Sequence, residues 1–269
     1  MSERQTTGDR GRRFAVVGDP VGHSKSPAIH RAAFAACGID ATYEAIRVRA
    51  GHFGRVADEL RSGTLNGVNV TMPLKGEAFR SIDRSSPDAA RAESVNTVIP
   101  TDGLLTGRNT DVAGVMHAVD KLEVDDEAPV LILGGGGAAR SAAIAVEGRT
   151  IIVSTRRPEA AASLLEVSAT IGTVAPWGAA IDGAIVINAT PLGMHGESLP
   201  EEVLQSSGGL VDMAYGSEPT AAVKTARHLG IPVADGLDML VGQAAAAFTA
   251  FTGIAAPLDA METAARKAE

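Results

Sequence analysis

The sequence of 269 residues lacks the features of several common protein classes. Cys37 is its only cysteine, which excludes an internal disulfide framework and a paired-cysteine metal site and favours a reducing compartment. No apolar run approaches the roughly 20 residues of a membrane span, because VLILGGGG and GAIVINAT are soon interrupted by glycine or polar residues. Residues 1–13 are polar and charged, which excludes a secretory signal there and predicts a disordered tail on a cytoplasmic protein.

Basic residues are also in the minority. The chain has 24 Lys and Arg against 32 Asp and Glu, a net charge of −8, which argues against nonspecific binding of nucleic acid. A hydrophobic content of 45% is typical of a globular protein rather than a disordered one. None of the six histidines has a partner at zinc-like spacing, so no metal is expected. The absence of a GxSxG motif and of a Ser-His-Asp order excludes the common hydrolases.

Short β-branched runs alternate with alanine-rich stretches along the chain. This alternation is typical of βαβ units around a mainly parallel sheet, so we predict an α/β fold. The expected strands are FAVVG at 14–18, GVNVT at 67–71, VLILG at 130–134, TIIVST at 150–155, AIVINAT at 184–190 and GLVDMA at 209–214.

Two joints divide the chain. One lies at residues 109–111 and the other at Gly236, before an alanine-rich stretch. We therefore predict a discontinuous N-terminal domain over 14–110, a Rossmann-like dinucleotide-binding domain over 111–236, and C-terminal helices over 237–269 that return to the first domain.

A glycine-rich turn follows the strand at 130–133. Gly134, Gly136 and Ala139 match the GxGxxG/A pattern, in which glycines let backbone N–H groups approach a pyrophosphate at a helix N-terminus. A merely flexible turn is the alternative. Four consecutive glycines between an apolar strand and a helix favour the dinucleotide site, which includes Gly135, Gly137 and Ala138.

The position after the next strand indicates which dinucleotide is bound. An NAD site usually has Asp or Glu there, whereas this chain reads Thr155-Arg156-Arg157-Pro158. Two guanidinium groups can hold a 2′-phosphate, so we predict NADP. The same residues could also cap the next helix, with Pro158 at its first position.

Hydroxyl and amide side chains gather in the N-terminal part. Ser24 and Ser26 precede a helix, where Ser26 is expected to be the N-cap and both hydroxyls could bind a small anion. Asn69 and Thr71 lie on one face of a strand. Asn96 lies between a helix and a strand, where a turn is its default role.

Lys75 and Asp111 are the two charged residues of interest in this part. A helix is expected to begin at Pro73, which places Lys75 in its first turn, where the helix dipole opposes a cation. An exposed lysine that tolerates this penalty is the alternative to a functional one. Asp111 opens a helix and could be a simple N-cap or first-turn anion.

The sequence resembles the shikimate dehydrogenase family over nearly its whole length. The resemblance rests on HSKSP (23–27), NVTMPLK (69–75), SVNT (94–97), GRNTD (107–111), GGGGAAR (134–140), NATPLG (188–193), DMAY (212–215) and LDMLVGQAA (237–245), in family order. It implies reversible, NADPH-dependent reduction of 3-dehydroshikimate to shikimate in aromatic amino-acid biosynthesis.

The resemblance also implies roles for individual residues. Lys75 and Asp111 match the catalytic pair, with Lys75 exchanging the proton. The implied substrate positions are Ser24, Ser26, Asn69, Thr71, Asn96, Tyr215 and Gln243. The implied cofactor positions are Gly134, Gly135, Gly136, Gly137, Ala138, Thr155, Arg156, Arg157, Thr190, Met213 and Gly236.

The chain departs from the family pattern at a few positions. Arg31 replaces an asparagine, Asp238 a glycine, Glu93-Ser94 a Gly-Ala pair, and Thr155 a frequent asparagine. A charge near a pocket rim can change the preference for related ring acids. Two alternatives therefore stay open: a paralogue that uses quinate or an amino-shikimate, with NADP or NAD, and a catalytically silent ligand sensor. The choice between monomer and homodimer stays open as well.

Overall fold

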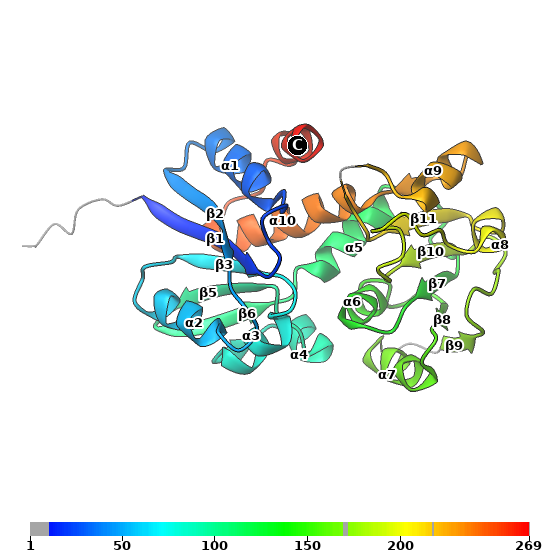
Figure 1. Ribbon diagram of the computed structural model, residues 1–269, viewed down its shortest axis with the longest axis horizontal. Helices are drawn as coiled ribbons and strands as arrows, with labels where there is room; N and C mark the ends of the chain where they lie inside the picture. The colour runs from blue at the N-terminus through cyan, green and yellow to red at the C-terminus, as the bar shows by residue number, and fades with distance from the viewer. Residues whose placement is uncertain (1–10, 169–171, 217, 269) are drawn as a thin grey trace, which may run out of the picture.

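The chain folds into two lobes in a computed structural model that describes residues 11–168, 172–216 and 218–268. Each lobe is built on one six-stranded sheet, and two helices, α5 (Asp111–Asp120) and α10 (Gly236–Thr252), run between the lobes (Figure 1). The predicted α/β class is confirmed.

The first sheet is mixed and has the strand order β2-β1-β3-β5-β6-β4. β1 pairs in parallel with β2 and β3, whereas β5 is antiparallel to β3 and β6. The strands are β1 (Arg12–Gly18), β2 (Ala41–Arg47), β3 (Gly67–Val70), β4 (Arg84–Ser85), β5 (Thr97–Thr101) and β6 (Leu104–Arg108). The helices of this lobe are α1 (Ser26–Ala36), α2 (Phe53–Arg61), α3 (Lys75–Ser81) and α4 (Pro87–Ala92).

The second sheet is entirely parallel, in the order β12-β11-β10-β7-β8-β9. Its central strands are buried at every position, as expected where helices cover both faces. The strands are β7 (Val130–Leu133), β8 (Ile151–Ser154), β9 (Gly172–Ala175), β10 (Ile185–Asn188), β11 (Gly209–Asp212) and β12 (Val233–Ala234). The helices are α6 (Gly137–Ala145), α7 (Pro158–Ser168), α8 (Glu201–Gln205) and α9 (Ala221–His228).

All six strands expected from the sequence are present, within two residues of their predicted ends. β1 begins at Arg12, inside the stretch expected to be a tail, while residues 1–10 of that stretch lie outside the described residues. The β5–β6 hairpin was not predicted. Its turn residues Asp102 and Gly103 have φ of 51° and 77°, as in a two-residue type I′ turn.

The C-terminal helices lie against the first lobe. α10 and α11 (Leu258–Lys267) pack beside α1, as Figure 1 shows. Phe248 and Phe251 of α10 are buried with Phe14 and Phe34, and the rings of Phe14 and Phe251 are 4.8 Å apart. The chain therefore passes between the lobes twice.

Glycines bring the two connecting helices together. A Cβ on Gly242 of α10 would lie 2.6 Å from the Cβ of His117 and 3.1 Å from the Cα of Gly114, both on α5. A Cβ on Gly114 would lie 2.7 Å from the carbonyl oxygen of Met239. Only residues without side chains fit this crossing, since atoms cannot approach so closely without displacement.

An ion network ties α10 to its neighbours at the junction. Asp235 and Asp238 form a capping box at the start of α10. Asp238 accepts from Lys121, which follows α5, at 2.8 Å and from Arg266 of α11 at 2.7 Å. Burial raises the pKa of Asp238, but the hydrogen bond from Lys121 and the charge of Arg266 outweigh it and lower the pKa.

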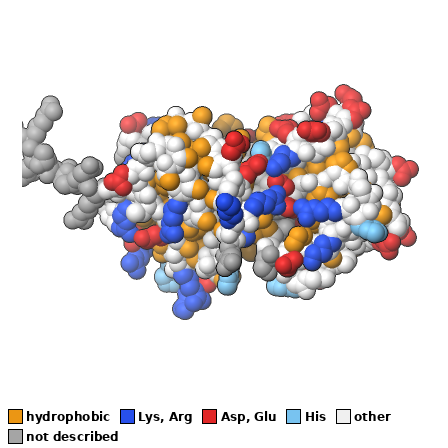
Figure 2. All heavy atoms as spheres, turned by 90° about the horizontal axis from the view of Figure 1, so that it is seen from above, with side chains coloured by type: hydrophobic (Ala, Val, Ile, Leu, Met, Phe, Trp, Pro, Cys, Tyr) orange, Lys and Arg blue, Asp and Glu red, His pale blue; other side chains and the backbone are white. Residues whose placement is uncertain are grey.

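Figure 2 views the molecule from the side of α9 and α11, and acidic and basic side chains lie together in the middle of that face.

A membrane-spanning helix is not found in the part of the chain that the structure describes, since each helix there is too short or too polar to cross a bilayer.

Candidate active site

A lysine, an aspartate and an asparagine meet where the first lobe joins the connecting helices. Lys75 is the first residue of α3, and its Nζ lies 2.5 Å from Oδ2 of Asp111. Asn96 donates from Nδ2 to the other carboxylate oxygen, Oδ1, at 2.9 Å. Asp111 is buried, and Lys75 keeps 29% of its side chain exposed. The pair therefore has one end fixed inside the protein and one end open to solvent.

The helix that carries Lys75 begins later than predicted. Leu74 is its N-cap, and Pro73 lies in the preceding turn rather than in the helix. Lys75 itself opens the helix, so its ammonium still faces the positive end of the dipole. Its hydrogen bond to the buried carboxylate opposes that penalty.

Asn96 is held on several sides. Its Oδ1 accepts from the backbone N–H of Thr110 at 2.7 Å and from the hydroxyl of Thr97 at 3.2 Å. Its Nδ2 also lies 3.4 Å from Oε1 of Gln243 on α10. Asn96 is thus no simple turn residue, since it joins the end of β6, the start of α5 and the middle of α10.

The side-chain amide of Asn69, next to this group, forms hydrogen bonds through both its oxygen and its nitrogen. Its Oδ1 accepts from the hydroxyl of Tyr43 at 2.6 Å, and its Nδ2 donates to the hydroxyl of Thr97 at 2.9 Å. Thr97 in turn contacts Asn96. Tyr43 and Thr97 were not predicted as site residues, and their long separation from Asn69 in the sequence left no local signal.

The predicted cap at α1 is wrong. Lys25, not Ser26, is the N-cap residue, and it makes no side-chain cap. Ser26 is the first residue of the helix, and its backbone N–H donates to Oγ of Ser24 at 3.3 Å. Ser24 therefore takes the capping contact, and within the described residues the Ser26 hydroxyl has no hydrogen-bond partner.

Thr71 follows β3, and its Cγ2 occupies the space that a Cβ on Gly18 would need.

Tyr215 is not joined to the Lys75–Asp111 group by any hydrogen bond among the described residues. Its ring packs against the core formed by α1, α10 and α11, and burial raises its pKa. A Cβ on Gly236 would lie 2.8 Å from the Cβ of Tyr215, so the glycine makes room for Tyr215 at the start of α10.

The glycine turn of the second lobe has the geometry of a dinucleotide site. Gly134 has a φ of +129°, and a Cβ there would lie 2.9 Å from the carbonyl oxygen of Ala189. A Cβ on Gly135 would lie 2.9 Å from Oγ1 of Thr155. Gly136 and Gly137 instead face open space at the N-terminus of α6, where their N–H groups are available to a phosphate. A side chain at Gly134 or Gly135 would therefore collide with neighbouring residues, whereas Gly136 and Gly137 have open space around them.

Two arginines follow β8 beside this turn. Arg156 lies over the ring of Trp177, with its guanidinium carbon 5.8 Å from the ring centroid. Arg157 donates to the carbonyl oxygen of Gly135 at 3.3 Å, and its backbone N–H donates to Oγ1 of Thr155. Trp177 was not among the predicted site residues, although a lone tryptophan in a chain with 3% aromatic residues is a usable signal.

Thr190 and Met213, which were also predicted to bind the cofactor, follow the carboxyl ends of β10 and β11. Thr190 follows β10 and donates to Oδ1 of Asn188 at 2.6 Å, while Met213 follows β11 and its N–H donates to the carbonyl oxygen of Asn188. Asn188 also donates to the buried Asp212 at 2.8 Å. Strand order reverses between β7 and β10, and ligands of doubly wound sheets bind at such a point.

Comparison with known proteins identifies the family of this chain. The family model described as the shikimate dehydrogenase substrate binding domain matches residues 16–98, and the shikimate 5′-dehydrogenase C-terminal domain matches residues 236–266. A curated NADP(+) shikimate dehydrogenase of Thermus thermophilus is 37% identical over 95% of this chain and 98% of its own length.

Solved structures match the whole fold. A shikimate 5-dehydrogenase of Thermus thermophilus in complex with NADP(H) and shikimate superposes with a TM-score of 0.89 at 36% identity, covering 96% of this chain and 100% of its own. An enzyme named Ael1 from Pseudomonas putida superposes at 0.84 with 30% identity, covering 94% of this chain and 97% of its own. The chain belongs to the shikimate dehydrogenase family.

Proposed function

We propose that this protein catalyses the reversible, NADPH-dependent reduction of 3-dehydroshikimate to shikimate. The observation that carries the proposal is the contact of Lys75 with the buried Asp111, which Asn96 holds from its other side. A relative at 36% identity has a solved structure with NADP(H) and shikimate, which supports the same ligands here.

The residues of the second lobe fit NADP. Gly136 and Gly137 would hold the pyrophosphate at the N-terminus of α6, where no Cβ blocks the approach. Arg156, positioned by Trp177, would hold the 2′-phosphate, with Arg157 and Thr155 beside it. Ala138 in the first turn of α6 and Thr190 after β10 would line the cofactor site. Met213 after β11 and Gly236 at the start of α10 would lie beside them. The bound cofactor supplies the hydride in reduction and accepts it in oxidation.

Lys75 moves the proton in this proposal. A ketone that gains hydride develops negative charge on its oxygen, which an adjacent ammonium stabilises and then protonates. An ammonium has three N–H donors, and the carboxylate of Asp111 takes one of them, so donors are left for the reacting oxygen. Asp111 orients the lysine and can also accept a hydrogen bond from the substrate hydroxyl.

The substrate would lie across the first lobe. Ser24 and Ser26 would bind its carboxylate, and Thr71, Asn96 and Gln243 its ring hydroxyls, with Tyr215 at the second-lobe side. Asn69 has both amide groups engaged by Tyr43 and Thr97, so we assign it to positioning Asn96 rather than to direct contact.

Two alternatives differ from this proposal in substrate or in activity. A paralogue could act on quinate or an amino-shikimate, yet Arg31 donates to the carbonyl oxygen of Tyr43 at 2.9 Å, and Asp238 is occupied by Lys121 and Arg266. These two departures from the family pattern thus have structural partners, which favours shikimate. A silent sensor would not need the Lys75–Asp111 pair.

The test is a matrix of initial rates, with shikimate or quinate as substrate and NADP⁺ or NAD⁺ as oxidant, followed at the absorbance of reduced nicotinamide. We expect the highest kcat/KM with shikimate and NADP⁺. Preference for quinate would contradict the proposed substrate, and preference for NAD⁺ the proposed cofactor. Absence of turnover in all four pairings, with binding of shikimate intact, would support the sensor instead.

A further inference from the structure

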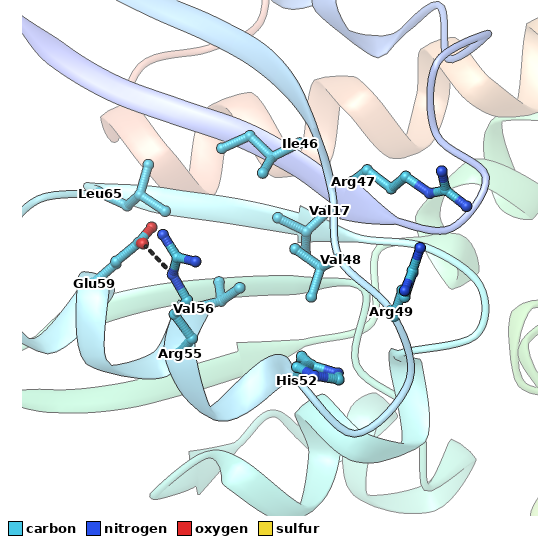
Figure 3. A pocket seen from close by; sticks show the side chains of 10 residues that line it. All are labelled: Val17, Ile46, Arg47, Val48, Arg49, His52, Arg55, Val56, Glu59 and Leu65. Carbon is cyan, nitrogen blue, oxygen red and sulfur yellow. Dashed lines mark hydrogen bonds and ion pairs between the residues drawn. The ribbon is translucent and has the colours of Figure 1, made fainter.

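The first lobe contains a cavity that the proposed reaction does not use. It has a volume of about 310 Å³ and lies between β2, the loop that follows it and α2 (Figure 3). Neither Lys75 nor Asp111 lines it. Its lining residues are Val17, Ile46, Arg47, Val48, Arg49, His52, Arg55, Val56, Glu59 and Leu65.

The cavity has an apolar floor, which is an extension of the core beneath the first sheet. Val17, Val56 and Leu65 are buried members of that core, and Ile46 and Val48 pack against it while partly exposed. An exposed apolar surface inside a concave site favours a ligand with an apolar body.

The polar side of the cavity is cationic, although the protein as a whole has a net charge of −8. Three arginines and one glutamate line it, with Arg47 and Arg49 at one end and the Arg55–Glu59 pair at the other (Figure 3). A local excess of positive charge in an acidic protein favours an anionic ligand.

The three arginines differ in whether the guanidinium group already forms an ion pair with a carboxylate. Arg47 Nε lies 2.8 Å from Asp19, and Arg55 Nε lies 3.3 Å from Glu59. Arg49 has no acidic or hydrogen-bonding partner for its side chain among the described residues. A single free guanidinium matches one carboxylate through two parallel hydrogen bonds.

The loop that carries Arg49 is held in place. Glu77 of α3 accepts from the backbone N–H groups of Gly51 and Phe53, at 2.9 and 2.8 Å. The N–H of Val48 donates to the carbonyl oxygen of Gly18 at 3.0 Å. A site whose backbone is already ordered loses less entropy when it binds a ligand.

We propose that this cavity binds a small organic monoanion, a carboxylate on an apolar body, with the carboxylate on Arg49 and the body on Val48, Val17 and Val56. The volume lies at the lower end of small-molecule sites, which fits a ligand about the size of one aromatic ring with a short acid chain.

The probe is 3-phenylpropionate, titrated into the full-length protein by calorimetry, with the neutral 3-phenylpropionamide as its matched control. We expect a Kd of roughly 1 mM or tighter for the acid. The amide should bind at least about tenfold more weakly. No detectable binding of the acid up to roughly 10 mM would overturn the proposal.

Variants locate the site. Arg49→Gln should weaken binding about tenfold or more, whereas Arg84→Gln, an exposed arginine on β4 at the other edge of the same sheet, should leave it unchanged. Val48→Thr replaces one methyl group by a hydroxyl of the same size and should weaken binding roughly threefold through the apolar floor. Equal affinity in wild type and Arg49→Gln contradicts the assignment.

Amide chemical-shift mapping separates this cavity from the active site, which could also accept a carboxylate. The expected shifts lie at Val17 and within residues 46–56. Shifts that cluster instead at residues 24–26 and 69–75 would place the probe in the active site and overturn the proposal. None of these readouts requires turnover, so they are independent of the proposed reaction.

Discussion

Lys75 and Asp111 each open a helix, and their side chains meet across those two helix N-termini at 2.5 Å. The positive ends of two dipoles stabilise the carboxylate and oppose the ammonium. Asp111 also begins the helix that leaves the first lobe, so its position depends on how α5 packs against α10. The pair is therefore fixed both by its own charges and by the connection between the lobes.

Replacing Lys75 should remove proton transfer while leaving the fold in place. Lys75→Met is expected to lower kcat by at least about 100-fold, with a much smaller effect on the Kd of NADP⁺, because the lysine lies in the first lobe. Steady-state kinetics and nucleotide titration measure the two effects. Lys224→Met, an exposed lysine on α9 with 60% of its side chain accessible, is the matched control and should keep full activity. A Lys75→Met protein with unchanged kcat would contradict the mechanism.

Arg156 should determine the choice of nicotinamide cofactor. Arg156→Gln removes the guanidinium that lies over Trp177, and we expect kcat/KM with NADP⁺ to fall by about 10- to 100-fold through the loss of a charge-assisted contact. The value with NAD⁺ should stay nearly unchanged, since NAD⁺ has no 2′-phosphate. Arg157→Gln serves as the comparison and should have a smaller effect, because Arg157 also donates to Gly135. Equal losses with both cofactors would indicate a structural role for Arg156.

The helix crossing gives a stability prediction. Gly242→Ala would place a Cβ 2.6 Å from the Cβ of His117, so α5 and α10 must separate, and the free energy of unfolding should fall by about 1–3 kcal/mol. Gly54→Ala in α2 is the control: a Cβ there meets nothing within 4 Å, and helix propensity predicts a gain of up to about 1 kcal/mol. Denaturant unfolding measures both. If Gly242→Ala were as stable as wild type, the crossing would not depend on close contact.

His30 gives a prediction about acid stability. Burial lowers the pKa of His30 from 6.5 to about 3, and its ring stacks on Tyr43 at 4.3 Å. Between these two pKa values the unfolded chain binds a proton that the folded protein excludes. The free energy of unfolding therefore falls as pH drops below about 6.5, with a slope of up to ~1.4 kcal/mol per pH unit from this residue.

His30→Phe keeps an aromatic ring against Tyr43 but cannot be protonated. Urea unfolding between pH 4 and 6.5 should show a shallower loss of stability for the variant than for wild type, while above about pH 7 the two proteins should depend on pH equally. Parallel curves across the acid range would mean that His30 does not contribute to acid unfolding.

Much of the second lobe was predictable because short stretches of sequence specify its strands and turns. Its central strands are buried on both faces, so VLIL and IVIN appear in the sequence as continuous apolar runs. The glycine turn and the arginines after β8 follow those runs at fixed spacing. In the first lobe, β2 is an edge strand in which only Tyr43 is buried, so its sequence contains no continuous apolar run that would predict a strand. The β5–β6 hairpin had a usable local signal, because Asp102-Gly103 is a dipeptide that favours a type I′ turn.

The sequence by itself determined the α/β class, the glycine turn of the second lobe and the residue types of the candidate site. Only the tertiary structure decided how these residues meet. Asn96 lies 15 residues from Asp111 and 147 from Gln243, and Lys75 lies 36 residues from Asp111. No local pattern specifies such contacts, because they depend on the mixed sheet order and on the close crossing of α5 and α10 at Gly114 and Gly242. Local preferences act over a few residues, whereas packing of distant helices and strands sets the distances between side chains.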